Sequence, residues 1–152
     1  MSIQSWMAEY YPVSGTEIAR KGTQASLEHG LLKFQGTLPE NLARHGLVLN
    51  GVFIEDLMGT RMFTLGWQAC GLCWIYQSSS GPLGVDFDCE GCPLYSENEE
   101  WVRNTCYDDG RGWDLLKFGE GPHVMIEELK AALEAWKQSG VIEEWAQEEG
   151  DD

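Results

Sequence analysis

Two Cys-x-x-Cys pairs are the residues in this sequence whose types and spacing most clearly indicate chemistry. Cys70 and Cys73 form the first pair, and after fifteen further residues Cys89 and Cys92 form the second. Each pair can fold into a tight turn that directs both sulfur atoms at one ion, and this spacing is typical of a four-cysteine zinc site. Because four thiolates complete a tetrahedron, no coordination position is left for a reactive water. We therefore predict a structural zinc ion at these four cysteines.

Other uses of the thiols stay open at the level of sequence. Iron in the same four-sulfur cage, buried unliganded thiols and a redox pair are the alternatives. The redox reading is weakened by residues 74–76, Trp-Ile-Tyr, which favour a strand where a thioredoxin-like pair would open a helix. Cys106 is a fifth thiol, which can replace one ligand or be a buried core residue. An odd number of cysteines fits a disulfide framework poorly.

The remaining reactive residue types form no recognisable catalytic set. The three histidines, His29, His45 and His123, are scattered along the chain, and no Ser-His-Asp arrangement can be argued from their surroundings. The glycine-containing stretch 109–112 lacks the Lys-Ser/Thr ending of a phosphate-binding loop. We therefore predict no catalytic residue and a protein that is not an enzyme.

The charge of the chain limits its partners. Among 152 residues, 25 are Asp or Glu and 10 are Lys or Arg, which gives a formal net charge of −15. Such a surface repels nucleic-acid phosphates and anionic lipids, so we expect neither as a direct partner. A protein with a basic surface is the expected partner, although the same charge can serve solubility alone. An acidic mimic of nucleic acid and a metal- or thiol-dependent enzyme are the alternative functions.

The termini and hydropathy predict the location of the protein. Residues 1–6 lack the basic and apolar regions of a secretory signal, and no apolar run is long enough to span a bilayer. We expect a cytoplasmic protein, where thiols stay reduced and metal binding is favoured over disulfides.

The first third of the chain is predicted to be helical. Ser2 can cap a helix over residues 2–10, and Trp6 and Tyr10 would share its buried face. A loop with one turn around Ile18 follows. A second helix begins at residue 23 or 26 and ends at residue 35, and a brief helix over residues 39–45 begins with Pro39. The apolar stripe of the second helix comprises Leu27, Leu31 and Phe34.

A small antiparallel sheet is predicted next. Residues 47–49 and 52–54 are apolar and flank Asn50-Gly51, which favours a two-residue hairpin turn. Further strands are expected at 61–65 and 74–76.

The last third is predicted to contain a long helix that begins at Pro122, ends before Gly140 and buries a stripe of apolar side chains. Residues 141–152 could add a helical turn that buries Val141, Ile142 and Trp145. We expect an α+β fold with helices at both ends of a small sheet. One domain would span 1–147, with a zinc-clipped segment at about 65–107 and an acidic tail at 148–152.

Three segments of the chain together resemble a family. They are the Leu-Glu-His-Gly-Leu-Leu-Lys-Phe helix at 27–34 with its Pro-Glu-Asn-Leu sequel, the Cys-x-Leu-Cys…Cys-x-Gly-Cys-Pro-Leu core, and the late Pro-x-x-Met-Ile-x-x-Leu helix. This combination resembles small cysteine-containing proteins of tailed bacteriophages and prophages, over residues from about 26 to 135. Relatives often carry a further Cys followed by Thr-Pro-Tyr, where this chain has Thr105-Cys106-Tyr107. The resemblance implies a phage accessory protein and no particular activity.

Overall fold

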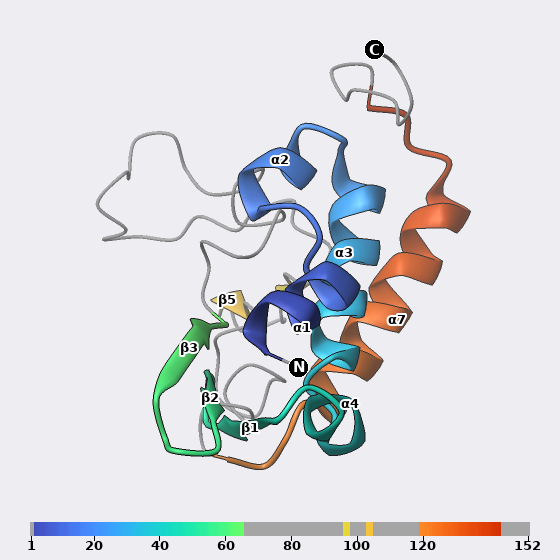
Figure 1. The fold of residues 1–152 in the computed structure, drawn as a ribbon. Coiled ribbons are helices and arrows are strands. Elements are labelled where there is room, and N and C mark those ends of the chain that lie inside the picture. The colour runs from blue at the N-terminus through green and yellow to red at the C-terminus, as the bar shows by residue number, and fades with distance from the viewer. Residues whose placement is uncertain (1, 66–95, 98–102, 105–118, 144–152) are drawn as a thin grey trace.

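The computed structural model describes residues 2–65, 96–97, 103–104 and 119–143. Helices and a small antiparallel sheet share one core in this part of the chain, which agrees with the predicted α+β class. The long helices α3 (Thr23–Gln35) and α7 (His123–Ser139) run side by side, and α1 (Ile3–Tyr10) lies between α3 and the sheet in the view of Figure 1.

Local capping explains where the first two helices begin. The Ser2 hydroxyl accepts a hydrogen bond from the Ser5 amide at 3.3 Å, and the Ser5 hydroxyl accepts one from the Ser2 amide at 2.9 Å, which forms a reciprocal capping box at the start of α1. In α2 (Gly15–Ala19), Ser14 caps the amide of Glu17. The predicted first helix and the predicted turn around Ile18 are both confirmed.

The helix α3 has no side-chain cap from its own N-terminal neighbour, Gly22. Its first turn is capped instead from the far end of the chain, because the Glu143 carboxylate accepts hydrogen bonds from the Thr23 amide at 2.5 Å and the Thr23 hydroxyl at 2.6 Å. A carboxylate at this position also interacts favourably with the helix dipole. The short helix α4 (Pro39–Ala43) then begins with the predicted proline.

The sheet has the order β1-β2-β3 and is antiparallel throughout. The strands are β1 (Leu47–Asn50), β2 (Phe53–Asp56) and β3 (Arg61–Thr64). The first hairpin is confirmed, but its turn lies one residue later than expected: Asn50 pairs with Phe53, so the loop consists of Gly51 and Val52 instead of Asn50 and Gly51. Gly51 has φ of +61°, a left-handed conformation that glycine adopts easily, and the Val52 carbonyl accepts a hydrogen bond from the Leu65 amide.

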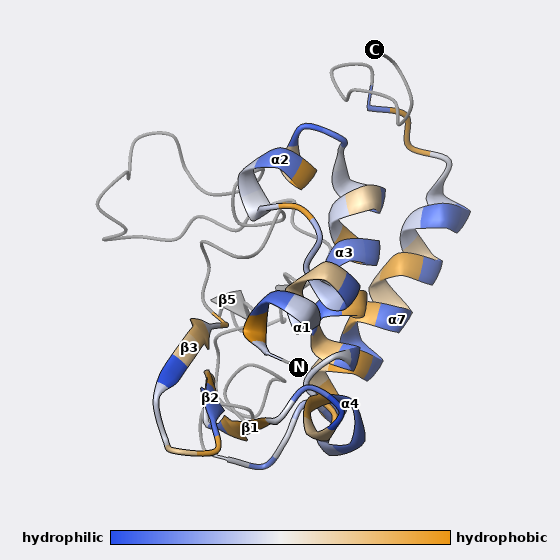
Figure 2. Ribbon diagram, viewed as in Figure 1, coloured by the Kyte–Doolittle hydropathy of each residue, from blue (hydrophilic) through white to orange (hydrophobic). Residues whose placement is uncertain are grey.

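The helix α7 packs its apolar face on α3. Met125, Ile126 and Leu129 are buried, and Figure 2 shows the contrast between the apolar and polar sides of this helix. Gly30 of α3 faces Leu129, and an added Cβ there would lie 3.6 Å from the Leu129 side chain, an ordinary contact distance. Gly140 ends α7 in the left-handed conformation, as predicted.

The segment after α7 corrects one prediction. Residues 141–143 form no helix, and the side chains of Val141 and Ile142 are 53% and 83% exposed. Glu143 reaches the start of α3, and this path leaves the two preceding apolar side chains in solvent. Trp145 lies outside the described residues.

The core joins helices and sheet through large side chains. Trp6 is fully buried, and its ring lies 5.9 Å from that of Tyr10 and 5.4 Å from that of Phe63 on β3, measured between centroids. The indole therefore fastens α1 to the sheet. Other apolar side chains with at most 1% exposure come from α3, α4, β2, the residue after β3 and α7: Leu27, Leu42, Ile54, Leu65 and Leu129.

A second, two-stranded pair consists of β4 (Ser96–Glu97) and β5 (Arg103–Asn104). The strand predicted at 74–76 lies outside the described residues. Within the described ranges, no helix combines the length and apolarity needed to cross a bilayer.

Candidate functional site

The predicted zinc ligands Cys70, Cys73, Cys89 and Cys92 all lie outside the described residues, as does Cys106. Among the residues that the structure does describe, no three His, Cys, Asp or Glu side chains gather closely enough to hold a metal ion. The four-cysteine zinc site therefore stays a prediction from spacing.

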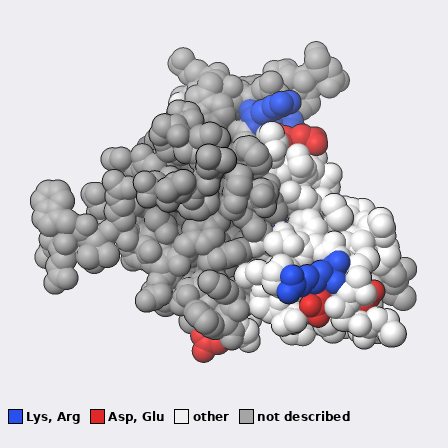
Figure 3. Space-filling model, turned by 90° about the vertical axis from the view of Figure 1, so that its left-hand side faces the viewer, with Lys and Arg blue, Asp and Glu red and all other residues white. Residues whose placement is uncertain are grey.

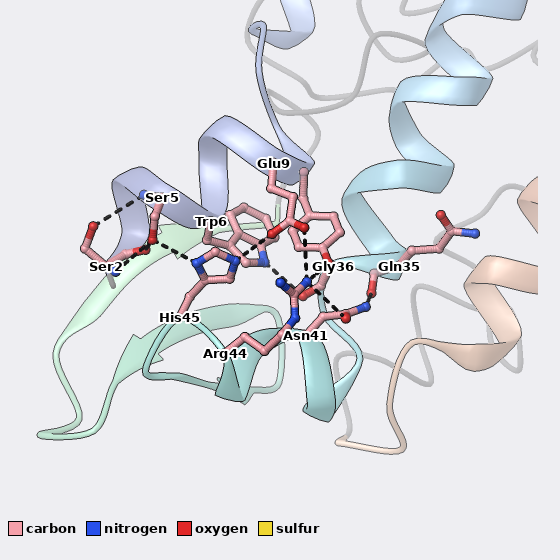
Figure 4. Close-up of polar contacts among 10 residues, drawn as sticks. Ser2, Ser5, Trp6, Glu9, Gln35, Gly36, Asn41, Arg44 and His45 are labelled. Carbon is pink, nitrogen blue, oxygen red and sulfur yellow. Dashed lines mark hydrogen bonds and ion pairs between the residues drawn. The ribbon is translucent and has the colours of Figure 1, made fainter.

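A Ser-His-Glu array lies where α1 meets the end of α4 (Figure 4). Ser5 Oγ lies 2.8 Å from His45 Nδ1, and His45 Nε2 lies 2.8 Å from Glu9 Oε1. The histidine is buried, at 8% exposure. These are the contacts that a nucleophile, a general base and an orienting carboxylate would make, so the array needs to be tested against the requirements of nucleophilic catalysis.

The Ser5 hydroxyl is already occupied by its neighbours. It accepts a hydrogen bond from the Ser2 amide at 2.9 Å, lies 2.9 Å from the Ser2 carbonyl and contacts His45. A serine hydroxyl has one proton, which can go either to the Ser2 carbonyl or to His45 Nδ1, and the Ser2 amide takes one of its two acceptor positions. Attack on a substrate would require the capping box of α1 to break. The array therefore has the chemistry of a structural fastener between α1 and α4.

Glu9 is the charged centre of this fastener. Its carboxylate accepts hydrogen bonds from Arg44 Nη2 at 3.1 Å and from His45 Nε2. The hydrogen bond from Arg44, followed by that from His45, holds the pKa of Glu9 below its ordinary value. Arg44 also donates to the Tyr10 hydroxyl at 2.5 Å, so one guanidinium joins two positions of α1.

The end of α3 is bound into the same junction. The indole of Trp6 donates to the Gly36 carbonyl at 2.8 Å, and Asn41 Nδ2 donates to the Gln35 carbonyl at 2.8 Å (Figure 4). These bonds satisfy carbonyls that the end of a helix leaves without an intrahelical partner. Gly36 cannot carry a side chain here, because an added Cβ would lie 2.7 Å from Tyr10 Cβ and closer still to its ring. We call this set of contacts among α1, α3 and α4 the helix junction.

A polar stripe is buried along α3, separate from its apolar stripe. Most of its members have partners: the Ser26 hydroxyl reaches the Ile18 carbonyl at 3.4 Å, and the Thr37 hydroxyl donates to the Phe34 carbonyl at 2.6 Å. The Lys33 ammonium lies 4.8 Å from the centroid of the Phe34 ring. The stripe, of which each member is at most 5% exposed, comprises Thr23, Ser26, His29, Lys33 and Thr37.

His29 is a titratable member of this stripe, and one of its two ring nitrogens lacks a hydrogen bond within the described part of the chain. Its Nε2–H donates to the Val13 carbonyl at 2.8 Å, and its buried Nδ1 has no hydrogen-bond partner among the described residues. Burial lowers the pKa of His29, and the nearby charge of Lys33 acts in the same direction. The side chain is therefore held as a neutral imidazole that positions the loop after α1 on α3.

His29 and His45 lie in different surroundings and do not meet. His45 lies between Ser5 and Glu9, whereas His29 packs against the Tyr11 ring at 5.0 Å between centroids and bonds to Val13. Sequence analysis did not identify Glu9 and Arg44 as members of a network, and their spacing of 35 residues along the chain carries no periodic signal that could have done so. No family model, curated protein or solved structure matches this chain.

Proposed function

We propose that this chain is a phage-type accessory protein that is not an enzyme and acts by binding a host or phage protein with a basic surface. In this proposal, the protein is cytoplasmic. It holds a structural zinc ion at Cys70, Cys73, Cys89 and Cys92. The observation that carries the proposal is the formal net charge of −15, since long-range attraction accelerates and orients association with a positively charged partner.

The state of the described polar groups supports a binding role. The Ser5 hydroxyl, the one serine hydroxyl that touches an imidazole in the described ranges, is also part of the capping box of α1. A protein that binds needs a fixed shape, and the helix junction supplies one through charged and uncharged hydrogen bonds.

A protein partner is also a better fit than mimicry of nucleic acid. A mimic needs free carboxylates in rows at the spacing of phosphates. Several described carboxylates are engaged within the chain instead: Glu9 with Arg44, Glu127 with Lys130 at 3.6 Å, and Glu143 with Thr23. On the described part of the face in Figure 3, the acidic groups stand apart from one another, and all but the group at the lower edge lie beside basic ones.

Metal analysis tests the scaffold. Purified protein should contain one zinc ion per chain, and a variant with Cys70→Ser and Cys89→Ser should lose it, because each pair then keeps a single thiolate. Cys106→Ser is the matched control and should retain the metal. Equal zinc content in the double variant and the wild type would rule out the proposed ligands.

Affinity capture tests the binding function. The tagged full chain should retain a basic protein from a lysate of a bacterial host at low salt and release it at high salt, because salt screens charge attraction. A preparation from which no protein is retained at low salt would contradict the proposal.

A further inference from the structure

The turn between β2 and β3 presents two large apolar side chains to solvent. Leu57 is 74% exposed and Met58 is 90% exposed. Apolar side chains also stand half-exposed on the adjoining strands, with Val48 at 43% on β1 and Met62 at 39% on β3. We call Leu57 and Met58 the hairpin tip. Two neighbouring large apolar groups at the point of a projecting hairpin have the form of an anchor that enters a pocket.

The backbone of the hairpin tip is fixed before any partner binds. The Asp56 carboxylate accepts hydrogen bonds from the amides of Met58 and Thr60, each at 2.9 Å. The Asp56 amide donates to the Thr60 carbonyl at 2.9 Å, and Gly59 supplies the left-handed residue of the turn with φ of +86°. A turn held in this way loses little conformational entropy when its side chains bind.

Charges beside the tip are engaged within the sheet. The Arg61 guanidinium lies over the Phe53 ring at 3.8 Å from its centroid, and Asn50 Nδ2 donates to Glu55 at 3.1 Å. Two carboxylates, Glu55 and Asp56, and one guanidinium therefore flank the tip. The border of the tip therefore has one more acidic than basic group, and its net charge has the same sign as that of the whole chain.

We propose that the hairpin tip is the anchor for the partner protein, and that the partner offers an apolar pocket bordered by Lys or Arg side chains. The negative charge of the chain favours a basic protein over two other possible partners, a second copy of this chain and an anionic bilayer. A second copy of this chain carries the same net charge of −15 and is repelled, and an anionic bilayer is repelled for the same reason. This inference rests on the proposed protein-binding function and assigns its surface.

Paired variants test the tip directly. Leu57→Ser with Met58→Ser removes the anchor, and Val141→Ser with Ile142→Ser is the matched control, because those two side chains are exposed to similar degrees on another part of the molecule. The probe is the basic protein that the wild-type chain retains at low salt. The tip variant should bind it about thirtyfold more weakly, the effect of losing a typical interface anchor. The control should bind as the wild type does.

Photo-crosslinking gives a second measurement on folded protein. A photoreactive amino acid at position 58 should attach the partner covalently, and the same amino acid at position 142 should not. If the tip variant captures the partner as well as the wild type does, the tip is not the anchor, and the proposed function stays in place. If the wild type captures no protein, both the anchor and the proposed function are overturned.

Two further results would also overturn the assignment. One is binding of the wild type to vesicles of neutral phosphatidylcholine that the tip variant loses, since the anchor would then enter lipid. The other is a dimer in analytical ultracentrifugation that the tip variant dissociates, since the pocket would then belong to a second copy.

Discussion

The helix junction and the hairpin tip have opposite chemistry. At the junction, polar and charged groups of α1, α3 and α4 are paired with one another, and an indole donates to a helix carbonyl. At the tip, two apolar side chains point into solvent from a backbone that is fully hydrogen bonded around Asp56. The junction uses its polar groups on one another, although the Arg44 and Glu9 side chains stay 53% and 41% exposed, and the tip displays apolar surface to solvent.

This difference separates stability from function along the chain. A substitution at the junction removes contacts that exist in the free protein, so it should lower the free energy of unfolding. A substitution at the tip removes no contact in the free protein, so its cost should appear only when a partner is bound. Variants of the two regions can therefore test whether the division is real.

Gly36→Ala should give the largest effect on stability. The added methyl group would lie 2.7 Å from Tyr10 Cβ, at a position where the backbone is helical and gains nothing from glycine. We expect a loss of about 3 kcal/mol in the free energy of unfolding, the upper part of the range for overpacking. Urea denaturation followed by tryptophan fluorescence would measure it, because Trp6 donates to the Gly36 carbonyl.

Gly30→Ala is the control for this substitution. An added Cβ there would meet Leu129 at 3.6 Å, an ordinary contact distance, and alanine favours a helix interior by up to about 1 kcal/mol. The variant should be as stable as the wild type or more stable. Equal destabilisation by both alanine variants would show that close packing at Gly36 is not a special feature of the junction.

The parts of this fold that the sequence predicts are those with local causes. Ser2, Pro39 and Gly140 mark helix boundaries through hydrogen bonding or backbone conformation within a few residues, and the structure confirms each of them. The first hairpin was also predicted, with its pairing register left open, and its turn lies one residue later than Asn50-Gly51. Continuous apolar flanks around Asn50 and Gly51 do not define a pairing, so tertiary contacts decide it.

The parts that the sequence does not predict depend on distant partners. Ser5 and His45 are 40 residues apart, and Thr23 and Glu143 are 120 residues apart. A polar residue gives no sign in the sequence of which distant group it will bond. Apolar character was equally ambiguous at Val141 and Ile142, because a large share of any folded surface is apolar.

Lowering the pH should also reduce the stability of the protein, because His29 becomes protonated. This effect should be smaller than that of Gly36→Ala. Its folded-state pKa lies below the ordinary value of 6.5, so the unfolded chain binds more protons in this range. The contribution of the neutral, buried ring is complete above about pH 6.5 and is lost as the pH falls from there through the folded-state pKa. The slope cannot exceed about 1.4 kcal/mol per pH unit for one proton. Denaturation at a series of pH values would measure it.

Two variants isolate this effect. His29→Gln keeps a side-chain amide that can donate to the Val13 carbonyl but does not titrate, so its stability should not fall in this window. Thr37→Val removes the buried bond to the Phe34 carbonyl and should lower stability while keeping the pH slope. The pKa of Glu9 is also lowered, from 4.5, and the contribution of that carboxylate is lost only at more acidic pH. A slope that persists in His29→Gln would assign the effect to another group.

Serine substitutions at the hairpin tip should have the smallest effect on the free protein. Leu57 and Met58 are 74% and 90% exposed, so replacing them buries no polar group and opens no cavity. We expect the double variant to unfold within about 0.5 kcal/mol of the wild type. Asp56→Ala at the base of the same turn is the contrasting change, since it removes the acceptor for two amides and should cost more, about 1–2 kcal/mol. A double serine variant as unstable as Asp56→Ala would mean that the tip side chains support the fold, and the opposition between junction and tip would no longer hold.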